Sequence, residues 1–281
     1  MNLPKYRDWY QQTDVHKPIR QYQWGEDPDF YGPRNYHREG RMLRELRRTI
    51  KSGCVLDAGC GNGWLTLRLV ANNYNVVGID SSPQCITHLR NKIKALHYYR
   101  KIYTYIGDLA KLSFRDNSFD GIVCGEVLEH IQDDTKVILE FFRVLRPGGI
   151  CVVTVPAKPD KWDIVDDISG HKRRYTRKEL EIKFRQAGFK IVKNIYWGFP
   201  LNNIWHSYIF LPFIVGTLKN GFNTSISSTL VARIIKQRMV QKVGSLVFTL
   251  DEIFDWTGLG NFLLLVATKD KIRKTHRNRY Q

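Results

Sequence analysis

The sequence lacks several features that would point to particular classes of protein. Its five cysteines form no Cys-x-x-Cys pair and several lie inside apolar runs, which favours buried free thiols in a reducing cytoplasm over disulfides. The opening residues, MNLPKYRDWYQQ, contain no apolar stretch typical of a secretory signal peptide. No internal repeat or low-complexity segment interrupts the 281 residues. These absences predict a cytoplasmic globular protein whose hydrophobic content of 43% suffices for one sizeable core.

Acidic residues are scarce relative to basic ones. Lys and Arg number 44 against 27 Asp and Glu, which gives a formal net charge of +17. The excess is clustered at residues 34–51, around 171–180 and in the tail after residue 268. Such clusters indicate a polyanionic neighbour, either nucleic acid, an anionic membrane surface or a phosphorylated substrate. A surface that only keeps the protein soluble is the alternative interpretation.

Short apolar runs alternate with helix-like segments along the chain. The runs are rich in β-branched residues and are bounded by Gly, Asp or Pro, which predicts strands at 54–59, 75–80, 101–108, 119–126, 150–156, 190–200 and 261–269. Helices are expected at 63–72, 82–97, 131–145 and 176–187. The segment RPGG at 146–149 is expected to be a turn that leads into the fifth strand. This alternation predicts an α/β protein with a mostly parallel, doubly wound, Rossmann-like sheet.

A glycine-rich loop, VLDAGCGNGWLT, joins the first expected strand to the first expected helix. Glycines let the backbone approach a ligand closely, because no Cβ intervenes and a positive φ costs little. A dinucleotide site requires Gly-x-Gly-x-x-Gly, but here the third glycine, Gly63, comes one residue early. Asp57 precedes the first glycine by two residues, where a carboxylate would repel a pyrophosphate and attract an amine. The loop therefore favours an amino-bearing ligand.

Four expected strands end in a carboxylate, namely Asp57, Asp80, Asp108 and Glu126. Ligands of such sheets bind beyond the carboxyl ends of the strands, so these side chains are expected to face one ligand. Together with the glycine loop, the pattern over residues 50–156 resembles the class I S-adenosylmethionine-dependent methyltransferases. The resemblance implies a seven-stranded sheet that ends in an antiparallel hairpin, and S-adenosyl-L-methionine as the cofactor.

The resemblance also implies a role for individual residues. Asp57 and the glycines would hold the methionine part, Asp80 the ribose and Asp108 the adenine, against which Leu109 would pack. The expected cofactor-binding residues are Asp57, Gly59, Gly61, Asn62, Gly63, Asp80, Ser81, Asp108, Leu109 and Glu126. Taken singly, each aspartate is more often a helix cap or a turn former, so the joint pattern carries the prediction.

The expected acceptor side begins with CGEVLEHIQDD, after the fourth strand. Glu126, Glu129 and His130 would converge if they occupied one helical turn, and His171 follows in a later loop. The ubiquinone-pathway O-methyltransferases and the small-RNA 3′-end ribose methyltransferases combine Glu-x-x-Glu-His with a later His to hold a divalent cation. The resemblance thus implies a site for Mg²⁺ or another divalent cation at Glu126, Glu129, His130 and His171. Without a metal, His130, His171 and Glu129 are the candidate catalytic residues, with either histidine as the general base, while Glu126 would contact the cofactor.

About sixty residues separate the last two expected strands, far more than a hairpin loop needs. Residues 195–218 contain no Asp, Glu, Lys or Arg, and prolines interrupt them too often for a spanning helix. The insertion is interpreted as a lid over an apolar acceptor, as a segment at an anionic membrane surface, or as a packed subdomain. An aromatic N-terminal segment, which includes Trp9, Tyr10 and Tyr22, is interpreted as a second lid wall or as core. The expected division is a lid segment at 1–35, a core at 36–197, the insertion at 198–260, the last strand at 261–269 and a basic tail at 270–281.

Two functions are therefore open. The first is O-methylation of a hydrophobic small molecule or of a lipid- or glycan-linked acceptor, by a cytoplasmic enzyme that is peripheral at the membrane surface. The second is methylation of the ribose of RNA, which the net charge and the metal-like pattern favour. The sequence contains no recognisable RNA-binding module, and a long uncharged aromatic insertion has no use in binding phosphates, so we expect the first.

Overall fold

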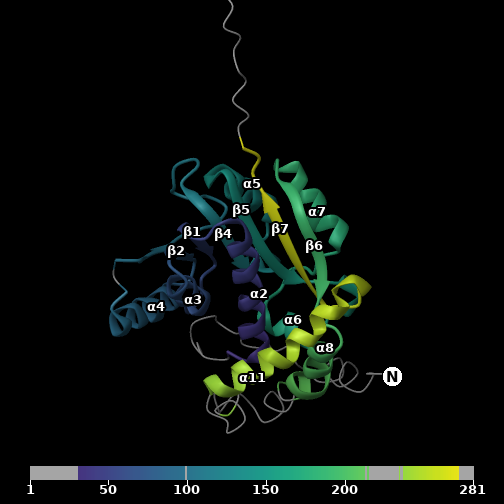
Figure 1. The fold of residues 1–281 in the computed structure, drawn as a ribbon. Coiled ribbons are helices and arrows are strands. Elements are labelled where there is room, and N and C mark those ends of the chain that lie inside the picture. Colours follow the sequence, from purple (N-terminus) through teal and green to yellow (C-terminus); the bar gives the residue numbers. More distant parts are fainter. Residues whose placement is uncertain (1–30, 99, 213, 215–233, 235–236, 272–281) are drawn as a thin grey trace, which may run out of the picture.

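The computed structural model describes residues 31–98, 100–212, 214, 234 and 237–271. Seven strands form one sheet in the order β3-β2-β1-β4-β5-β7-β6 (Figure 1). The strands are β1 Gly53–Ala58, β2 Tyr74–Asp80, β3 Ile102–Ile106, β4 Phe119–Gly125, β5 Leu145–Pro156, β6 Lys190–Trp197 and β7 Phe262–Thr268. Strands β1 to β5 pair in parallel, whereas β7 is antiparallel to both β5 and β6. The sequence prediction of a mostly parallel, Rossmann-like seven-stranded sheet is therefore confirmed.

Helices cover both faces of this sheet. They are α2 Pro33–Thr49, α3 Trp64–Ala71, α4 Pro83–Leu96, α5 Asp134–Val144, α6 Ile164–Ser169, α7 Arg177–Gln186, α8 Leu201–Trp205 and α11 Arg238–Phe248. Short turns of other helix types are η1 Leu128–His130, η2 Pro159–Lys161, the π-helix η3 His206–Phe210 and η5 Thr249–Thr257. One core cluster joins the sheet to α5 and α7, and a second joins its other face to α2, α3 and α4. In sheets of this doubly wound kind, ligands bind beyond the carboxyl ends of the parallel strands.

The local sequence explains most of these elements. Ser82 caps α4, because its hydroxyl accepts a hydrogen bond from the backbone N–H of Cys85, and Pro83 begins the helix. The four predicted helices and seven predicted strands are present, with ends shifted by a few residues. Two features differ from the sequence prediction. RPGG is part of β5, whose pairing with β4 shifts register there, and α2 was not predicted because its residues suggested only a basic surface.

The described part of the 198–260 insertion packs against the fold. Helix α11 lies along α2 at its lower end in Figure 1. The Asp251 carboxylate accepts hydrogen bonds from the backbone N–H groups of Leu201 and Asn202, at 2.8 and 2.9 Å. The buried Arg41 of α2 forms an ion pair with Asp255. These contacts connect the start and the end of the insertion to each other and to α2.

Several predicted features lie outside the described residues. They include Trp9, Tyr10 and Tyr22, most of the basic tail, and the middle of the insertion. The five cysteines carry free thiols, four of them buried, as the sequence suggested. Among the described helices, none is long and apolar enough to cross a membrane.

Candidate functional site

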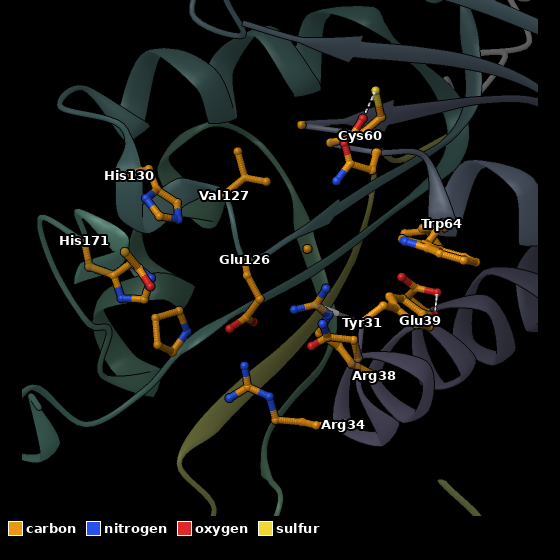
Figure 2. Close-up of a pocket in the computed structure, with 18 of the residues that line it drawn as sticks. Tyr31, Arg34, Arg38, Glu39, Cys60, Trp64, Glu126, Val127, His130 and His171 are labelled. Carbon is orange, nitrogen blue, oxygen red and sulfur yellow. Dashed lines mark hydrogen bonds between the residues drawn. The ribbon is translucent and has the colours of Figure 1, made fainter. Parts of the chain in front are cut away.

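A cavity of about 560 Å³ lies beyond the carboxyl ends of β1, β2 and β4. Its wall combines the glycine loop, the strand ends, the start of α2, the His130 and His171 region, and residues of the insertion. Figure 2 shows the two histidines on one side, Tyr31, Glu39 and Trp64 on the other, and Glu126 with Arg34 and Arg38 between them. Nine of the ten residues expected to bind the cofactor line this cavity, and Gly63 does not.

The glycine loop has the backbone that its sequence requires. Gly59, Gly61 and Gly63 all have positive φ angles, of 73°, 50° and 80°. A Cβ at Gly59 would come within 2.4 Å of Val127, and one at Gly63 within 2.2 Å of Leu89. A Cβ at Gly61 would meet no protein atom within 4 Å. Two of the glycines therefore allow the loop to pack, and the third leaves its backbone open for a ligand.

Asp80 holds the glycine loop to the end of β2. One of its carboxylate oxygens accepts from the backbone N–H of Gly61 at 2.9 Å, and the other accepts from the N–H of Ser82 at 2.9 Å. Burial raises the pKa of Asp80, while the backbone donors oppose that shift. The remaining lone pairs of this carboxylate border the cavity and are free to accept hydroxyl groups.

Asp57 is almost fully buried at the floor of the cavity. Its carboxylate accepts a hydrogen bond of 2.6 Å from the Thr66 hydroxyl, on α3. Burial raises the pKa of Asp57 to about 7, although the hydrogen bond from Thr66 opposes the shift. The Asp57 side chain is thus poised to change its protonation state when a cation binds nearby.

The third strand end resembles the other two. The Asp108 carboxylate accepts from the backbone N–H of Ala110 at 2.9 Å, and Leu109 is buried beside it. Both residues line the cavity together with Asn62 and Ser81. The strand-end acids that the sequence singled out therefore lie around one space.

His171 is oriented by a buried carboxylate. Its Nδ1 lies 2.7 Å from an oxygen of Asp166, which also accepts three hydrogen bonds from the guanidinium of Arg174. Burial would raise the pKa of Asp166, but the hydrogen bonds from His171 and Arg174 outweigh it and lower the pKa. An ionised Asp166 favours the tautomer of His171 that carries its proton on Nδ1. The Nε2 atom of His171 is then an acceptor at the cavity wall.

The buried Glu129 and the half-buried His130 lie next to His171. The side chain of Glu129 is 0% exposed, and neither of its carboxylate oxygens has a hydrogen-bond partner among the described residues. Burial raises the pKa of Glu129 well above its usual range and lowers the pKa of His130 to about 4. One oxygen of Glu129 lies 3.9 Å from Nε2 of His171, and the two imidazole rings meet edge to face at 4.7 Å.

Three of the four predicted metal ligands come together. Glu129, His130 and His171 each offer a donor atom, and these donors lie within 4.8 Å of one another. Glu126 is not part of the group: it has a φ of 58°, and its side chain lies between the histidines and the two arginines (Figure 2). The prediction assumed one helical turn from Glu126 onward, whereas the helical turn η1 includes only Leu128–His130.

The cavity-lining residues at the start of α2 and just before it were not identified from the sequence. Tyr31 stacks on Trp64 with ring centroids 4.7 Å apart, and its hydroxyl donates to the buried Glu39. Arg34 and Arg38 line the cavity from the same helix, in a stretch that was interpreted only as a basic surface. The i, i+4 spacing of these two arginines, which places them on one face of a helix, was the signal that could have identified them.

Several buried polar atoms of the cavity lining have no hydrogen-bond partner within the described part of the chain, and three of them lie near the cofactor end or the centre of the cavity. These three are Nε of Arg38, Nε1 of Trp64 and one carboxylate oxygen of Glu126. Buried polar groups are normally paired, so orphaned donors and acceptors around a cavity indicate a polar ligand. A zwitterionic ligand with hydroxyl and amino groups, such as S-adenosylmethionine, fits this donor and acceptor set.

Comparison with known proteins agrees with this geometry. Residues 56–153 match the family described as Methyltransferase domain. A probable S-adenosylmethionine-dependent methyltransferase of Mycolicibacterium smegmatis is 31% identical over 160 residues, which cover 56% of this chain and 59% of that protein. A demethylmenaquinone methyltransferase of Symbiobacterium thermophilum is 33% identical over 108 residues, covering 37% of this chain and 43% of that protein. The chain thus spans about half the length of the curated relatives it matches.

Solved structures show the same fold. The crystal structure of the cyclase SpnF superposes with a TM-score of 0.60 at 20% identity, covering 83% of this chain and 81% of that one. At this level of identity the similarity concerns the fold alone.

Proposed function

Because the chain carries a class I S-adenosylmethionine-dependent methyltransferase domain, we propose that it methylates a hydroxyl group of a hydrophobic small molecule or of a lipid- or glycan-linked acceptor. One observation carries this proposal: a single cavity joins the strand-end acids to the oriented His171 and to an apolar wall from the insertion. That wall includes Trp205, Phe210 and Ile214. The cofactor end and the acceptor end thus share one continuous cavity, as a direct transfer between two bound molecules requires.

The chain's own residues divide the work as follows. Asp57 and the glycine loop hold the methionine part of the cofactor, Asp80 accepts the ribose hydroxyls, and Asp108 accepts the adenine amino group. S-adenosylmethionine supplies an activated methyl group, so the carbon–sulfur bond breaks as the carbon–oxygen bond to the acceptor forms. Nε2 of His171 takes the hydroxyl proton, and Asp166 stabilises the imidazolium that results.

A divalent cation is the second candidate for activating the hydroxyl. Glu129, His130 and His171 would hold it, and the unpartnered carboxylate of Glu129 and the low pKa of His130 both fit that role. Such an ion would lower the pKa of a bound hydroxyl group. Nε2 of His171 can either ligate the ion or accept the proton, so the two mechanisms exclude each other.

The hydrophobic character of the acceptor is supported from two directions. The acceptor end of the cavity is bordered by aromatic and aliphatic side chains of the insertion, which bury apolar surface rather than phosphates. The name of the relative from Symbiobacterium thermophilum indicates a quinone-type substrate for that protein. RNA remains the alternative acceptor, and the apolar side chains at the acceptor end disfavour it.

Direct assay tests the proposal. Full-length protein, labelled S-adenosylmethionine and organic extracts or total RNA would be incubated separately, and the label followed into each fraction. We expect the label in an apolar extract, and NMR of the product should show the methyl group on oxygen. Label on carbon would replace the O-methylation proposal, and label only in RNA would replace the small-molecule proposal.

The first prediction is that the Asp57 carboxyl group releases a proton when the cofactor binds. With a pKa of about 7, Asp57 is mostly protonated at pH 6, whereas the cofactor ammonium beside it favours the carboxylate. Titration calorimetry at pH 6 in buffers of different ionisation enthalpy should therefore report a release of roughly 0.5–0.9 proton per cofactor. Asp57→Asn should abolish this release, and an unchanged release in that variant would contradict the assignment.

The same pKa has a consequence for stability. The folded protein holds this proton more tightly than the unfolded chain does, because the pKa is raised from 3.8 to about 7. The contribution of Asp57 therefore makes the fold less stable as the pH rises between those two values. Asp57→Asn should remove that part of the pH dependence in thermal unfolding.

The proposal also includes association of the protein with a membrane surface. The outer face of α11 and η5 is apolar, with Trp256 83%, Leu246 70% and Ile253 64% exposed. The opposite face, with Gln241, Phe248 and Asp251, is buried. An amphipathic segment that exposes its apolar face, with the exposed Arg238 and Lys242 beside it, matches an anionic lipid surface.

We expect the full-length protein to bind vesicles of mixed zwitterionic and anionic lipid at low salt. Leu246→Ser together with Trp256→Ser should weaken that binding at least tenfold, because each buried side chain contributes about 1.5–3 kcal/mol. Leu139→Ser is the matched control, since Leu139 is 49% exposed on α5 and remote from this face. Equal binding of all three proteins in co-sedimentation would remove the membrane element of the proposal.

A further inference from the structure

The cavity lining contains positive charge, on Arg34 and Arg38, that the described residues neutralise only in part. Neither Arg34 nor Arg38 forms a hydrogen bond or an ion pair with another residue in the described part of the chain. By contrast, Arg174 on the same wall is paired with Asp166 and Asp163. The side chains of Arg34 and Arg38 are half-buried, and guanidinium groups that are partly withdrawn from water are normally paired, so these two require an explanation.

Arg34 is held at the boundary between α2 and the insertion. Its guanidinium carbon lies 4.9 Å from the centre of the Phe262 ring and 5.7 Å from that of Phe210. Burial lowers the pKa of Arg34, and the neighbouring Arg38 and Arg174 act in the same direction, whereas Glu126 and Asp163 oppose it. The aromatic rings offset part of the cost of this buried charge, but they satisfy none of its N–H donors.

The two free arginines face different parts of the cavity. Arg38 lowers the pKa values of Asp57 and Glu39 at the cofactor end. It also acts on Glu129 near His171, so its charge lies between the two ends. Arg34 instead interacts electrostatically with Asp163 and Arg174, at the acceptor end. Arg38 can therefore neutralise the carboxylate of the cofactor, which leaves Arg34 for the other substrate.

The charge of the cofactor strengthens this requirement. S-adenosylmethionine carries a sulfonium and an ammonium against one carboxylate, so its binding adds a net positive charge to the cavity. Glu126 lies between the two arginines in Figure 2 and, together with Asp163, favours the charged form of Arg34. Asp163 is already paired with Arg174, and the single carboxylate of Glu126 cannot balance two guanidinium groups. An acceptor with an anionic group would supply the missing negative charge.

We propose that Arg34 binds an anionic oxygen group, a phosphate or a carboxylate, on an otherwise apolar acceptor. The inference rests on the proposed function and adds the chemical class of its acceptor. The anionic group lies against Arg34, the apolar part lies along Phe210 and Ile214, and the hydroxyl to be methylated points to His171. A guanidinium provides several N–H donors in one plane, which suits phosphate and carboxylate oxygens.

Binding, rather than turnover, tests this proposal. Full-length protein saturated with S-adenosylhomocysteine is titrated by calorimetry with decyl phosphate, decanoate, decanol and decyltrimethylammonium, all below their micelle concentrations. The four probes share one apolar chain and differ in the charge of the head group. We expect at least one anionic probe to bind tenfold or more tightly than decanol, and the cationic probe to bind most weakly; comparison of the phosphate with the carboxylate identifies the preferred group.

Arg34→Gln should remove the preference for anionic probes and leave the affinity for S-adenosylhomocysteine within about twofold. Its thermal midpoint without ligand should not fall, because the substitution removes an unpaired buried charge. Arg34→Lys, which keeps the charge, should retain part of the preference. Arg47→Gln is the matched control, since Arg47 is exposed on the same helix, donates a hydrogen bond to Asn72 and is not among the described residues that line the cavity.

Two results would overturn the proposal. Equal binding of decanol and both anionic probes by the unmodified protein would show that no anion site exists. Loss of S-adenosylhomocysteine binding in Arg34→Gln, with a normal thermal midpoint, would assign Arg34 to the cofactor instead. Because no methyl transfer is measured, a failure of the proposed reaction is distinguishable from either result.

Discussion

Asp80→Ala should weaken the binding of S-adenosylmethionine at least a hundredfold, which corresponds to about 2.7 kcal/mol. The carboxylate has two roles that alanine cannot fill. It holds the backbone N–H groups of Gly61 and Ser82, and it offers its remaining lone pairs to the ribose. Its loss therefore removes ligand contacts and releases the loop that approaches the ligand.

Titration calorimetry and thermal unfolding together check this prediction. The cofactor affinity of Asp80→Asn should lie between those of the unmodified protein and Asp80→Ala. The amide group has one acceptor oxygen in place of two, so it can replace only some of the hydrogen bonds that the carboxylate accepts. Asp160→Ala, in which an exposed carboxylate is removed elsewhere, should bind the cofactor normally. Cofactor affinity that stays within fivefold in Asp80→Ala would show that the strand-end acids do not form the cofactor site.

His171→Ala should lower kcat by about a hundredfold to ten-thousandfold, the range typical of a lost general acid or base. The affinity for cofactor should change little, because His171 lies at the opposite side of the cavity from Trp64 and the glycine loop (Figure 2). His97→Asn is the control, since His97 is exposed and has a positive φ that asparagine tolerates. Retention of more than a tenth of the activity in His171→Ala would exclude both proposed roles of this histidine.

Chelation separates the base mechanism from the metal mechanism. With His171 as the base, turnover persists in chelator, and Glu129→Gln remains active because the burial of Glu129 raises its pKa and favours the neutral form that glutamine resembles. With a cation bound, chelator and Glu129→Gln both abolish turnover, and Mn²⁺ binding followed by electron paramagnetic resonance is lost in Glu129→Gln. The resonance measurement is independent of activity and so identifies the ligand role directly.

The sequence alone determined the sheet and the cofactor side of the site. Alternating apolar runs and helical segments specify a parallel α/β sheet, because each segment's periodicity is a local property. The positions of Asp57, Asp80 and Asp108 followed from the strand assignment, because the carboxyl ends of parallel strands all lie at the same edge of the sheet. The glycines were equally readable, because a positive φ restricts the residue type at each position.

Only the tertiary structure decided which groups meet across the cavity. Arg34 and Arg38 looked like part of a basic surface, and their inward direction depends on how α2 packs against the sheet and the insertion. Glu126 was expected beside Glu129 because the sequence cannot distinguish an α-helical turn from a single turn of η1. Asp166, which orients His171, was not identified. The contact between the two side chains depends on the path of the chain from α6 to His171, which no local sequence pattern specifies. These contacts join segments that are distant in the chain. They depend on how both segments pack in the folded protein, which the local sequence of either segment does not specify.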